Sequence, residues 1–260
     1  MAGAEVLAGF RPALGAGGLH LSTFVQIPDP NLIETLARSP LDSLLLDMQH
    51  GMQDEASVQA SVAAAAMIGK PVLVRVPVDA GGLTSRMLDF GAAGVVCPMV
   101  NSVGDARRLV DYVKFPPTGR RSWGPRRAIP FSGLSAADYL RQADGLTLAL
   151  AMIETREALA ALDDILAVPG IDGIFVGPMD LSVSLSAGAT FDSPDAAAAI
   201  AAAGARARAA GKVAGIFALT PQLALDYHRQ GYGFVALMQD AMFLSQAATA
   251  ACTAVRGAVA

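Results

Sequence analysis

Charged residues are scarce in this sequence, and the basic ones form no long cluster. Of its 260 residues only 16% are charged, and 19 Lys and Arg against 23 Asp and Glu give a net charge of −4. Proteins bind phosphate backbones through clustered Lys and Arg, so we expect no nucleic-acid partner. With 53% hydrophobic residues, the chain is too apolar to be disordered. We expect part of this apolar surface to be buried between subunits of a homo-oligomer.

Cysteines and long apolar runs are also lacking. Cys97 and Cys252 have neither the number of a disulfide framework nor the spacing of a metal site. A membrane-spanning helix needs about 20 apolar residues, and the most apolar stretch, 241–255, is interrupted by polar side chains such as Gln246. The N-terminus carries Glu5 and does not resemble a secretion signal. We therefore expect a cytoplasmic protein with no membrane partner.

Short apolar runs alternate with longer helix-forming stretches, which is the pattern of a parallel sheet covered by helices. The runs rich in Val, Ile and Leu predict strands at residues 19–26, 43–47, 72–76, 94–98, 146–153, 173–176, 213–217 and 234–238. The intervening stretches predict helices at residues 31–38, 55–68, 83–90, 103–113, 156–167, 194–210, 221–230 and 241–255. Eight such units in about 250 residues predict an α/β fold, a (β/α)8 TIM barrel forming a single domain over residues 1–260.

Glycine placement and one long interruption add two expectations. The GxGxxG fingerprint of dinucleotide-binding folds is absent, since Gly15, Gly17 and Gly18 precede the first predicted strand instead of following it. We expect no nucleotide cofactor. Residues 115–145 are rich in Pro, Gly and Arg, and they predict a long loop between the fourth helix and the fifth strand. We expect this loop to lie over the barrel mouth and to serve function there.

Polar residues follow several of the predicted strands, at the end where barrel enzymes place their active sites. Asp47 and His50 lie at the end of the second strand, and Arg75 lies at the end of the third. Glu154 follows the fifth strand and Asp180 follows the sixth. These five side chains are therefore expected to converge at the barrel mouth.

Glu154 and Asp180 bring two carboxylates to this mouth. Carboxylate oxygens suit Mg²⁺ or Mn²⁺, with water and substrate oxygens completing the coordination shell. Taken singly, Glu154 could form a salt bridge, and Asp180 could cap a short helix at residues 181–185. Their pairing at one level of the barrel favours a divalent metal site.

Arg75 lies within an apolar run, where an unpaired cation would be too costly to bury. One interpretation is a structural ion pair with Asp47. The other is a clamp for a carboxylate or an oxyanion, because the planar guanidinium group donates parallel hydrogen bonds.

His50 is a candidate acid and base. It is beside Asp47, and Gly51 allows a substrate to approach closely. An imidazole with an unperturbed pKa of about 6.5 can both take and return a proton. Alone, a histidine in this place would more often be structural; its neighbours favour catalysis.

A metal, an arginine and a histidine base together describe a site that binds a 2-oxo acid through its carboxylate and carbonyl groups and stabilises its enolate. The other route to such chemistry, a Schiff base, requires a lysine at the mouth. Lys70 and Lys212 precede the third and seventh strands, and Lys114 ends a helix. We therefore expect no Schiff-base lysine.

Several segments around these residues resemble a known family. They read LLLDMQHG at 44–51, VRVP at 74–77, GAAGVVCPMV at 91–100, IET at 153–155 and GIDGIFVGPMDLS at 170–182. In this order they resemble the HpcH/HpaI aldolases, the metal-dependent class II pyruvate aldolases. The similarity runs from the IPDP sequence at 27–30 to the last strand and helix.

The resemblance implies a reversible aldol reaction between pyruvate, or a similar 2-oxo acid such as hydroxypyruvate, and an aldehyde. It implies one divalent cation, Mg²⁺, Mn²⁺ or Co²⁺, bound by Glu154 and Asp180. In this family pattern His50 is the base and Arg75 stabilises the enolate. Asp89 matches an acid that raises the basicity of the histidine.

The resemblance also implies how the substrate is held and how subunits assemble. Gly177, Pro178 and Met179 correspond to a segment whose N–H groups, except at proline, bind the substrate carboxylate. Met152 stands where some members carry a substrate-contacting glutamine. The family forms trimer-based hexamers that exchange the last helix. Because Asp89 ends a helix at the face opposite the mouth, we expect it to approach the histidine of a neighbouring subunit.

Two other classes of function are compatible with parts of this site. Oxaloacetate decarboxylases and acyl-CoA lyases generate the same enolate, although coenzyme A would require a basic surface track that the sequence does not clearly show. A non-catalytic barrel that binds a 2-oxo acid would not need a base beside a metal. The aldolase is the function that the sequence favours.

Overall fold

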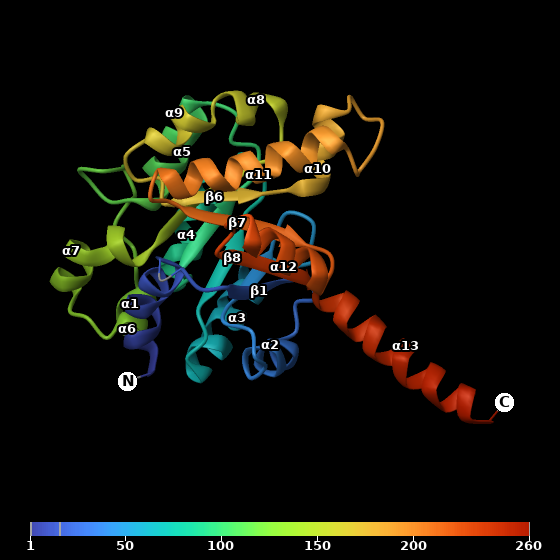
Figure 1. Ribbon diagram of the computed structural model, residues 1–260. Coiled ribbons are helices and arrows are strands. Elements are labelled where there is room, and N and C mark those ends of the chain that lie inside the picture. The colour runs from blue at the N-terminus through green and yellow to red at the C-terminus, as the bar shows by residue number, and fades with distance from the viewer. Residues whose placement is uncertain (1, 16, 260) are drawn as a thin grey trace.

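The protein forms a closed barrel of parallel strands surrounded by helices (Figure 1). A computed structural model describes residues 2–15 and 17–259, and eight strands within them pair in chain order, with β8 closing against β1. The strands are β1 His20–Val25, β2 Leu44–Asp47, β3 Val72–Arg75, β4 Gly94–Cys97, β5 Leu148–Ile153, β6 Gly173–Val176, β7 Val213–Ala218 and β8 Phe234–Gln239. The (β/α)8 barrel prediction is confirmed.

Helices follow the strands and cover the outside of the barrel. Those predicted from sequence are α2 Pro30–Ala37, α3 Glu55–Ile68, α4 Gly81–Asp89, α5 Val103–Val113, α8 Arg156–Ala160 with α9 Leu162–Ala167, α11 Pro194–Ala209, α12 Pro221–Arg229 and α13 Asp240–Val259. The short helix expected beside Asp180 is α10 Pro178–Leu185, which begins three residues earlier than predicted. Local side chains set the ends of these helices, as α3 illustrates. Asp54 and Ser57 form a capping box at its start, and Gly69 ends it in a left-handed conformation with φ 81°.

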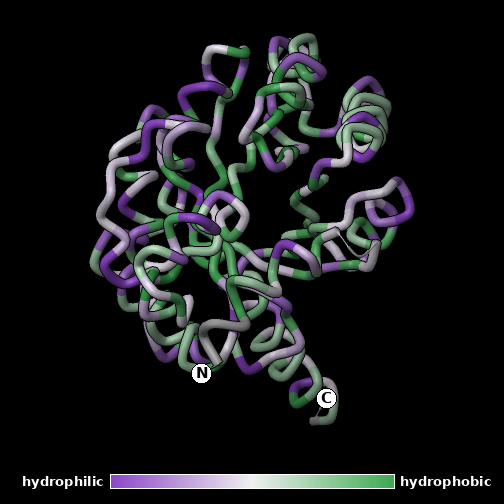
Figure 2. Tube along the Cα trace, turned by 90° about the vertical axis from the view of Figure 1, so that its left-hand side faces the viewer, coloured by the Kyte–Doolittle hydropathy of each residue, from purple (hydrophilic) through white to green (hydrophobic). Residues whose placement is uncertain are grey.

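Apolar side chains form one core between strands and helices and a second core inside the barrel. Figure 2 shows the hydrophobic colour concentrated along the central strands and the hydrophilic colour mainly on outer turns. Helix α1, Ala2–Gly15, was not predicted, and its Leu7, Phe10 and Leu14 belong to the core inside the barrel. Phe10 stacks edge-on against His20 at the start of β1, with ring centroids 5.2 Å apart. Helix α1 therefore closes the barrel at the end where strands begin.

The segment 115–145 corrects the sequence-based prediction. It contains α6 Ala128–Ser132 and extends into α7 Ala136–Leu146, both of which pack against α1 (Figure 1). The Asp144 carboxylate accepts a hydrogen bond from the Phe115 N–H at 2.9 Å and holds the two ends of the segment together. Since α1 closes the opposite end of the barrel, these helices do not form a loop over the mouth.

Helix α13 leaves the body of the molecule (Figure 1). Among its apolar side chains, Leu244 is 51% and Val255 is 66% exposed. Within residues 2–15 and 17–259, no helix is long and apolar enough to cross a membrane.

Candidate active site

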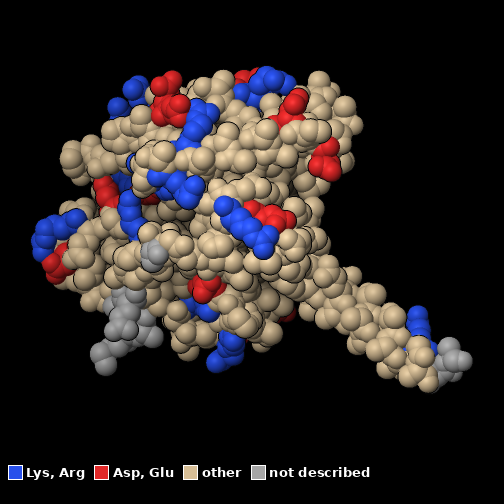
Figure 3. All heavy atoms as spheres, viewed as in Figure 1, with Lys and Arg blue, Asp and Glu red and all other residues tan. Residues whose placement is uncertain are grey.

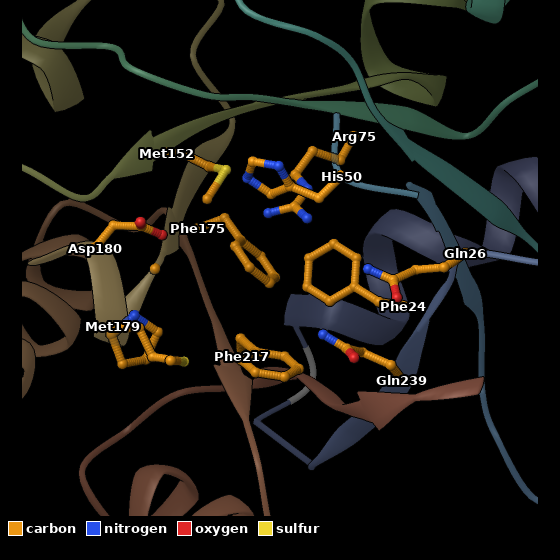
Figure 4. A pocket seen from close by; sticks show the side chains of 12 residues that line it. Phe24, Gln26, His50, Arg75, Met152, Phe175, Met179, Asp180, Phe217 and Gln239 are labelled. Atoms are coloured by element: carbon orange, nitrogen blue, oxygen red, sulfur yellow. The ribbon is translucent and has the colours of Figure 1, made fainter. Parts of the chain in front are cut away.

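A small pocket opens at the end of the barrel where the strands finish. Its volume is about 140 Å³, and its lining comes from the ends of β1, β3, β5, β6, β7 and β8, the turn after β2 and the start of α10 (Figure 4). The lining residues are Phe24, Gln26, His50, Arg75, Met152, Phe175, Gly177, Pro178, Met179, Asp180, Phe217 and Gln239. Seven of these were predicted from sequence as site residues: His50, Arg75, Met152, Gly177, Pro178, Met179 and Asp180.

The β2–β3 pairing explains how Arg75 can be buried. Asp47 and Arg75 are direct neighbours in the strand register. Arg75 Nε donates to Asp47 Oδ1 at 2.9 Å, and Nη2 donates to Oδ2 at 2.7 Å. The ion pair considered from sequence is therefore present, and it leaves Nη1 available for a substrate oxygen. The guanidinium carbon also lies 4.3 Å from the centre of the Phe24 ring.

Asp47 is a positioning carboxylate beneath the pocket. It is fully buried, and burial alone would raise its pKa. The hydrogen bonds and charge of Arg75, with the Gln26 amide and the His50 N–H, outweigh burial and lower the pKa of Asp47 below its ordinary value. Asp47 therefore stays ionised and fixes the orientation of Arg75.

His50 reaches the pocket because of a tight turn after β2. Its N–H donates to Asp47 Oδ1 at 3.2 Å, while its ring lies among the pocket residues (Figure 4). A Cβ on Gly51 would lie 2.3 Å from the Asp47 carbonyl oxygen and 2.9 Å from the Gln26 Cα. Glycine is thus required here for close packing of the backbone, in addition to any role in substrate approach.

Glu154 and Asp180 converge around Gly177. The β5–β6 register pairs Ile153 with Val176, so the residues that follow these strands are neighbours. A Cβ on Gly177 would lie 3.2 Å from Glu154 Oε2 and 3.4 Å from Asp180 Oδ2. Glycine therefore leaves open the space between the two carboxylates.

Neither simpler role considered for these acids is found. Helix α10 has Gly177 as its N-cap and no side-chain cap, so Asp180 lies inside the first turn instead of capping it. Among the described residues, no salt bridge joins Glu154 or Asp180 to a basic side chain. Across the same residues, no three His, Cys, Asp or Glu side chains gather as a metal site. A cation here would have two protein carboxylates and would need water or substrate for its other ligands.

Glu154 is held from the other side by Met99. The Met99 N–H donates to Glu154 Oε1 at 2.7 Å, and this residue has a left-handed backbone with φ 56°. Burial raises the pKa of Glu154, the Met99 N–H opposes this effect, and the nearby Asp180 adds to it. The hydrogen bond fixes one carboxylate oxygen and leaves Oε2 facing Gly177. Sequence gave no signal for Met99, because the strained conformation arises only in the folded turn.

The start of α10 offers N–H groups to the pocket. The Gly177 N–H already donates to the Ile153 carbonyl at 3.4 Å, and Pro178 has no N–H. Met179, at the second position of the helix, therefore presents an N–H of the kind that binds anions at helix starts. Within the segment 177–179, which was predicted to bind the substrate carboxylate, Met179 is thus the residue whose N–H is neither missing nor given to Ile153.

Asp89 does not line this pocket. It ends α4, and its carboxylate accepts a hydrogen bond from Arg121 Nη2 at 2.7 Å. It lines a separate surface hollow that also includes Arg120 and Trp123. Arg121 is 3% exposed and lies against the ring of Phe115. The structure thus places Asp89 and His50 in different pockets of the same chain.

The lysines lie near the beginnings of strands. Lys114 pairs with Asp172 at 2.7 Å and donates to the Thr147 carbonyl just before β5. Lys70 donates to the Leu41 carbonyl, and Lys212 donates to the carbonyl of Ile171 just before β6. Each ammonium group has a backbone partner away from the mouth.

Sequence reasoning did not identify the aromatic part of the pocket. Phe24 packs edge to face against both Phe175 and Phe217. Its ring centroid lies 5.9 Å from that of Phe175 and 5.5 Å from that of Phe217. Gln26 and Gln239 complete this side (Figure 4). In a list of apolar strand residues these phenylalanines look like ordinary core. Only closure of the barrel reveals which of them reach its upper layer.

Comparison with known proteins identifies the family. The family model described as "HpcH/HpaI aldolase/citrate lyase" matches residues 20–247. A hydroxypyruvate/pyruvate aldolase from Rhizorhabdus wittichii is 40% identical over 240 residues, covering 92% of this chain and 94% of that protein. A 4-hydroxy-2-oxo-heptane-1,7-dioate aldolase from Salmonella dublin is 34% identical over 241 residues, covering 93% and 92%.

Solved structures agree with this comparison. The crystal structure of an HpcH/HpaI aldolase/citrate lyase family protein from Burkholderia cenocepacia superimposes with a TM-score of 0.87 at 30% identity. The match covers 95% of this chain and 99% of that one. Fold and sequence therefore point to the same family.

Proposed function

This chain belongs to the HpcH/HpaI aldolase/citrate lyase family and is an aldolase, and on that premise we propose that it joins pyruvate, hydroxypyruvate or a similar 2-oxo acid to an aldehyde. The observation that carries this proposal is the convergence at one mouth of a histidine, a guanidinium group and two carboxylates. The relatives named for hydroxypyruvate and pyruvate support the class of nucleophile.

Glu154 and Asp180 are proposed to hold one divalent cation, Mg²⁺, Mn²⁺ or Co²⁺. The fit is supported by their donor chemistry, two carboxylates, and by the open space that Gly177 leaves between Oε2 and Oδ2. When bound, the cation would polarise the carbonyl group of the 2-oxo acid and so make the neighbouring C–H bond more acidic.

Arg75 is proposed to stabilise the oxygen that gains negative charge. Its two hydrogen bonds to Asp47 fix the plane of the guanidinium group before substrate arrives. This fixed orientation favours Nη1 as a hydrogen-bond donor to the enolate oxygen, because a preorganised donor needs no reorganisation during the reaction. The Met179 N–H is proposed to bind the substrate carboxylate at the start of α10.

His50 is proposed to carry the proton. In aldol addition it accepts a proton from C3 of the 2-oxo acid; the C–H electron pair forms the C2–C3 double bond, and the carbonyl pair moves to oxygen. The pair on the enolate oxygen then re-forms the C2 carbonyl, and the C2–C3 double-bond pair joins C3 to the aldehyde carbon. The carbonyl pair of the aldehyde moves to its oxygen, which takes the proton from His50. Cleavage follows the same steps in reverse. The support is the placement of this ring in the pocket (Figure 4). Among the described residues, no salt bridge joins His50 to a carboxylate.

We further propose a trimer-based hexamer in which Asp89 from one subunit approaches His50 of another and α13 packs on a neighbour. Support comes from the separation of the two residues within one chain. It also comes from α13, which extends from the body with apolar side chains exposed. Figure 3 shows this helix almost free of charged groups, with blue only near its end, where Arg256 lies.

A cytoplasmic location remains our proposal for this enzyme. The thiols of Cys97 and Cys252 are both free. Free thiols are usual in a reducing compartment, and Cys252 is exposed on α13.

The test of the proposed function is aldol synthesis from pyruvate or hydroxypyruvate and glycolaldehyde, with protein that has been stripped of metal. We expect synthesis after addition of Mn²⁺, Co²⁺ or Mg²⁺, and almost none in Glu154→Gln. Glu157→Gln, an exposed acid three residues along the chain, is the matched control and should behave as wild type. Equal synthesis in excess EDTA would refute the metal site, and absence of synthesis with every cation would refute the aldol function.

A further inference from the structure

Arg121 is a buried cation that the reaction steps above do not use. Among the described residues, nine arginines form ion pairs, and seven of these have side chains that are 35% to 85% exposed. The two exceptions are Arg75 in the active site, at 10%, and Arg121, at 0%. Burying a guanidinium group is costly unless its partners are well placed. An arginine buried in this way is either structural or, like Arg75, part of a site.

An aromatic ring and the backbone hold Arg121 in place. Its guanidinium carbon lies 4.7 Å from the centre of the Phe115 ring, which is a cation–π distance. Trp123 packs against the same ring, with centroids 5.4 Å apart. The Arg121 N–H donates to the Lys114 carbonyl at 3.0 Å. Within the described part of the chain, Nε and Nη1 have no hydrogen-bond partner, so the Phe115 ring and the acceptor of Nη2 orient the guanidinium group.

The acceptor of Nη2 is the carboxylate of Asp89. Nη2 donates to Asp89 Oδ1 at 2.7 Å, and the Asp89 side chain is 24% exposed. A Cβ on Gly124 would lie 3.2 Å from Oδ2, and both residues line the surface hollow described above. No other side chain of the described residues donates to this carboxylate. Arg121 therefore fixes Oδ1, and glycine at position 124 leaves Oδ2 open for a donor from outside the chain.

This geometry assigns Arg121 an indirect role. With no exposed surface on its side chain, it cannot contact a substrate in a neighbouring active site. It can act there only through the carboxylate that it holds. We propose that Arg121 is a positioning residue that works across the subunit interface, where it keeps Asp89 Oδ2 directed at the partner subunit's His50. This inference rests on the proposed function and its shared site, and it adds the group that orients Asp89.

Lysine should be able to replace arginine at position 121, although not at position 75. Arg121 gives one nitrogen to one carboxylate oxygen, whereas Arg75 gives two nitrogens to Asp47 and has a third proposed for the substrate. A lysine ammonium group can supply a single charged hydrogen bond and can also lie over an aromatic ring. Methionine has a similar length but no charge and no donor.

The experiment measures deuterium uptake at C3 of pyruvate in D₂O by mass spectrometry, with saturating Mn²⁺ and no aldehyde. We expect kcat for exchange to fall about 10- to 100-fold in Arg121→Met, the range for losing a group that orients a functional side chain. KM for pyruvate should stay as in wild type, because the groups proposed to bind the 2-oxo acid are unchanged. Arg121→Lys should recover most of the lost rate. Arg141→Met, which removes an exposed guanidinium from an ion pair with Asp138, is the matched control and should exchange as wild type.

Mixed oligomers test whether Arg121 acts on the neighbouring subunit. In an equal mixture of Arg121→Met and His50→Ala chains, about a quarter of the sites should combine an intact His50 with an intact Asp89 and Arg121, so exchange should rise to about a quarter of the wild-type rate. A mixture of Arg121→Met with Asp89→Asn should show no such rise, because both changes damage the same half of every site. An arginine that only stabilises its own chain would not give this pattern.

The outcomes separate failure of this inference from failure of the proposed function. Wild-type exchange in Arg121→Met, no recovery in Arg121→Lys, or a rise with Asp89→Asn instead of His50→Ala would each overturn the role of Arg121 while the proposed function stands. If Arg121→Met does not assemble alone by light scattering, its mixture with His50→Ala decides: a rise supports the role, and its absence refutes it. If the wild type exchanges no protons with any cation, the proposed function is wrong and this inference is refuted with it.

Discussion

Replacing Arg75 by lysine should affect the chemical step more than substrate binding. Lysine keeps the positive charge but cannot donate two hydrogen bonds in a fixed plane. In the wild type, Nε and Nη2 bind the two oxygens of Asp47, and Nη1 is the nitrogen that we propose as donor to the enolate oxygen. A lysine ammonium group at this site would therefore serve Asp47 or the enolate oxygen, but not both in the wild-type geometry.

Two magnitudes follow from this geometry. Asp47 is fully buried, and losing one charged hydrogen bond to it costs about 1.5–3 kcal/mol. For a chain of 260 residues this corresponds to a Tm lowered by roughly 3–6 °C. Loss of a preorganised donor to the enolate oxygen lowers the chemical rate by about 10²–10³.

The assay uses proton NMR to follow the loss of the pyruvate C3–H signal in D₂O. The protein is saturated with Mn²⁺, and matched controls contain Mg²⁺ instead. Arg75→Lys should exchange about 10² times more slowly or worse, with a smaller change in the pyruvate concentration needed for half-maximal rate. Arg86→Lys, which removes an exposed guanidinium from an ion pair with Glu55, should exchange at the wild-type rate. An unchanged exchange rate in folded Arg75→Lys protein would refute the role given to this residue.

Four further outcomes test other parts of the account. Gly177→Ala should weaken Mn²⁺ binding, measured by calorimetry, because the added Cβ would lie 3.2 Å from Glu154 Oε2; unchanged affinity would contradict a metal site between Glu154 and Asp180. His50→Ala should abolish exchange yet keep its bound metal, and loss of metal would instead make it a ligand. The pKa of Asp47 is held below its ordinary 3.8, so ionised Asp47 stabilises the fold at pH values above this. The difference in free energy of unfolding between wild type and Asp47→Asn should be constant from about pH 5 to 7 and shrink as pH falls below 3.8. Denaturant titrations in which this difference already shrinks near neutral pH would contradict the assignment. Mixed oligomers reassembled from His50→Ala and Asp89→Asn chains should regain activity, and the shared site is wrong if they do not.

The barrel could be predicted from sequence because its strands are buried on both faces. Such strands appear as short continuous apolar runs, and β6 Gly173–Val176 has the bounds that its run predicts. Helix α1 was missed although Leu7, Phe10 and Leu14 have helical spacing. The other helices were predicted as the second part of a βα unit. Helix α1 precedes the first strand and therefore belongs to no such unit.

The segment 115–145 shows a different limit. Its prolines and glycines predict a loop, and they hide the signal that Ser135 caps α7 by accepting from the Asp138 N–H. The larger error was to place this segment over the barrel mouth, because the sequence does not indicate at which end of the barrel an insertion packs. Contact with α1 decides that question, and α1 itself was not foreseen.

For the site, the side chains that follow strands could be predicted, and the contacts that orient them could not. Asp180 and Arg75 stand out as charges beside apolar runs. The hydrogen bond from the Met99 N–H to Glu154 depends on a left-handed backbone, and the position of Phe217 depends on how β7 meets β8. Both arise from tertiary structure, for which a single sequence carries no periodic signal.

The central claim is that this pocket forms the enolate of a 2-oxo acid with one divalent cation held by Glu154 and Asp180. Its most direct measurement is C3 proton exchange of pyruvate in D₂O by metal-stripped protein, titrated with Mn²⁺. We predict no exchange before addition, a rise that saturates at one ion per chain, and no rise in Asp180→Asn. Full exchange in excess EDTA, or an equal rise in Asp180→Asn, would contradict the claim.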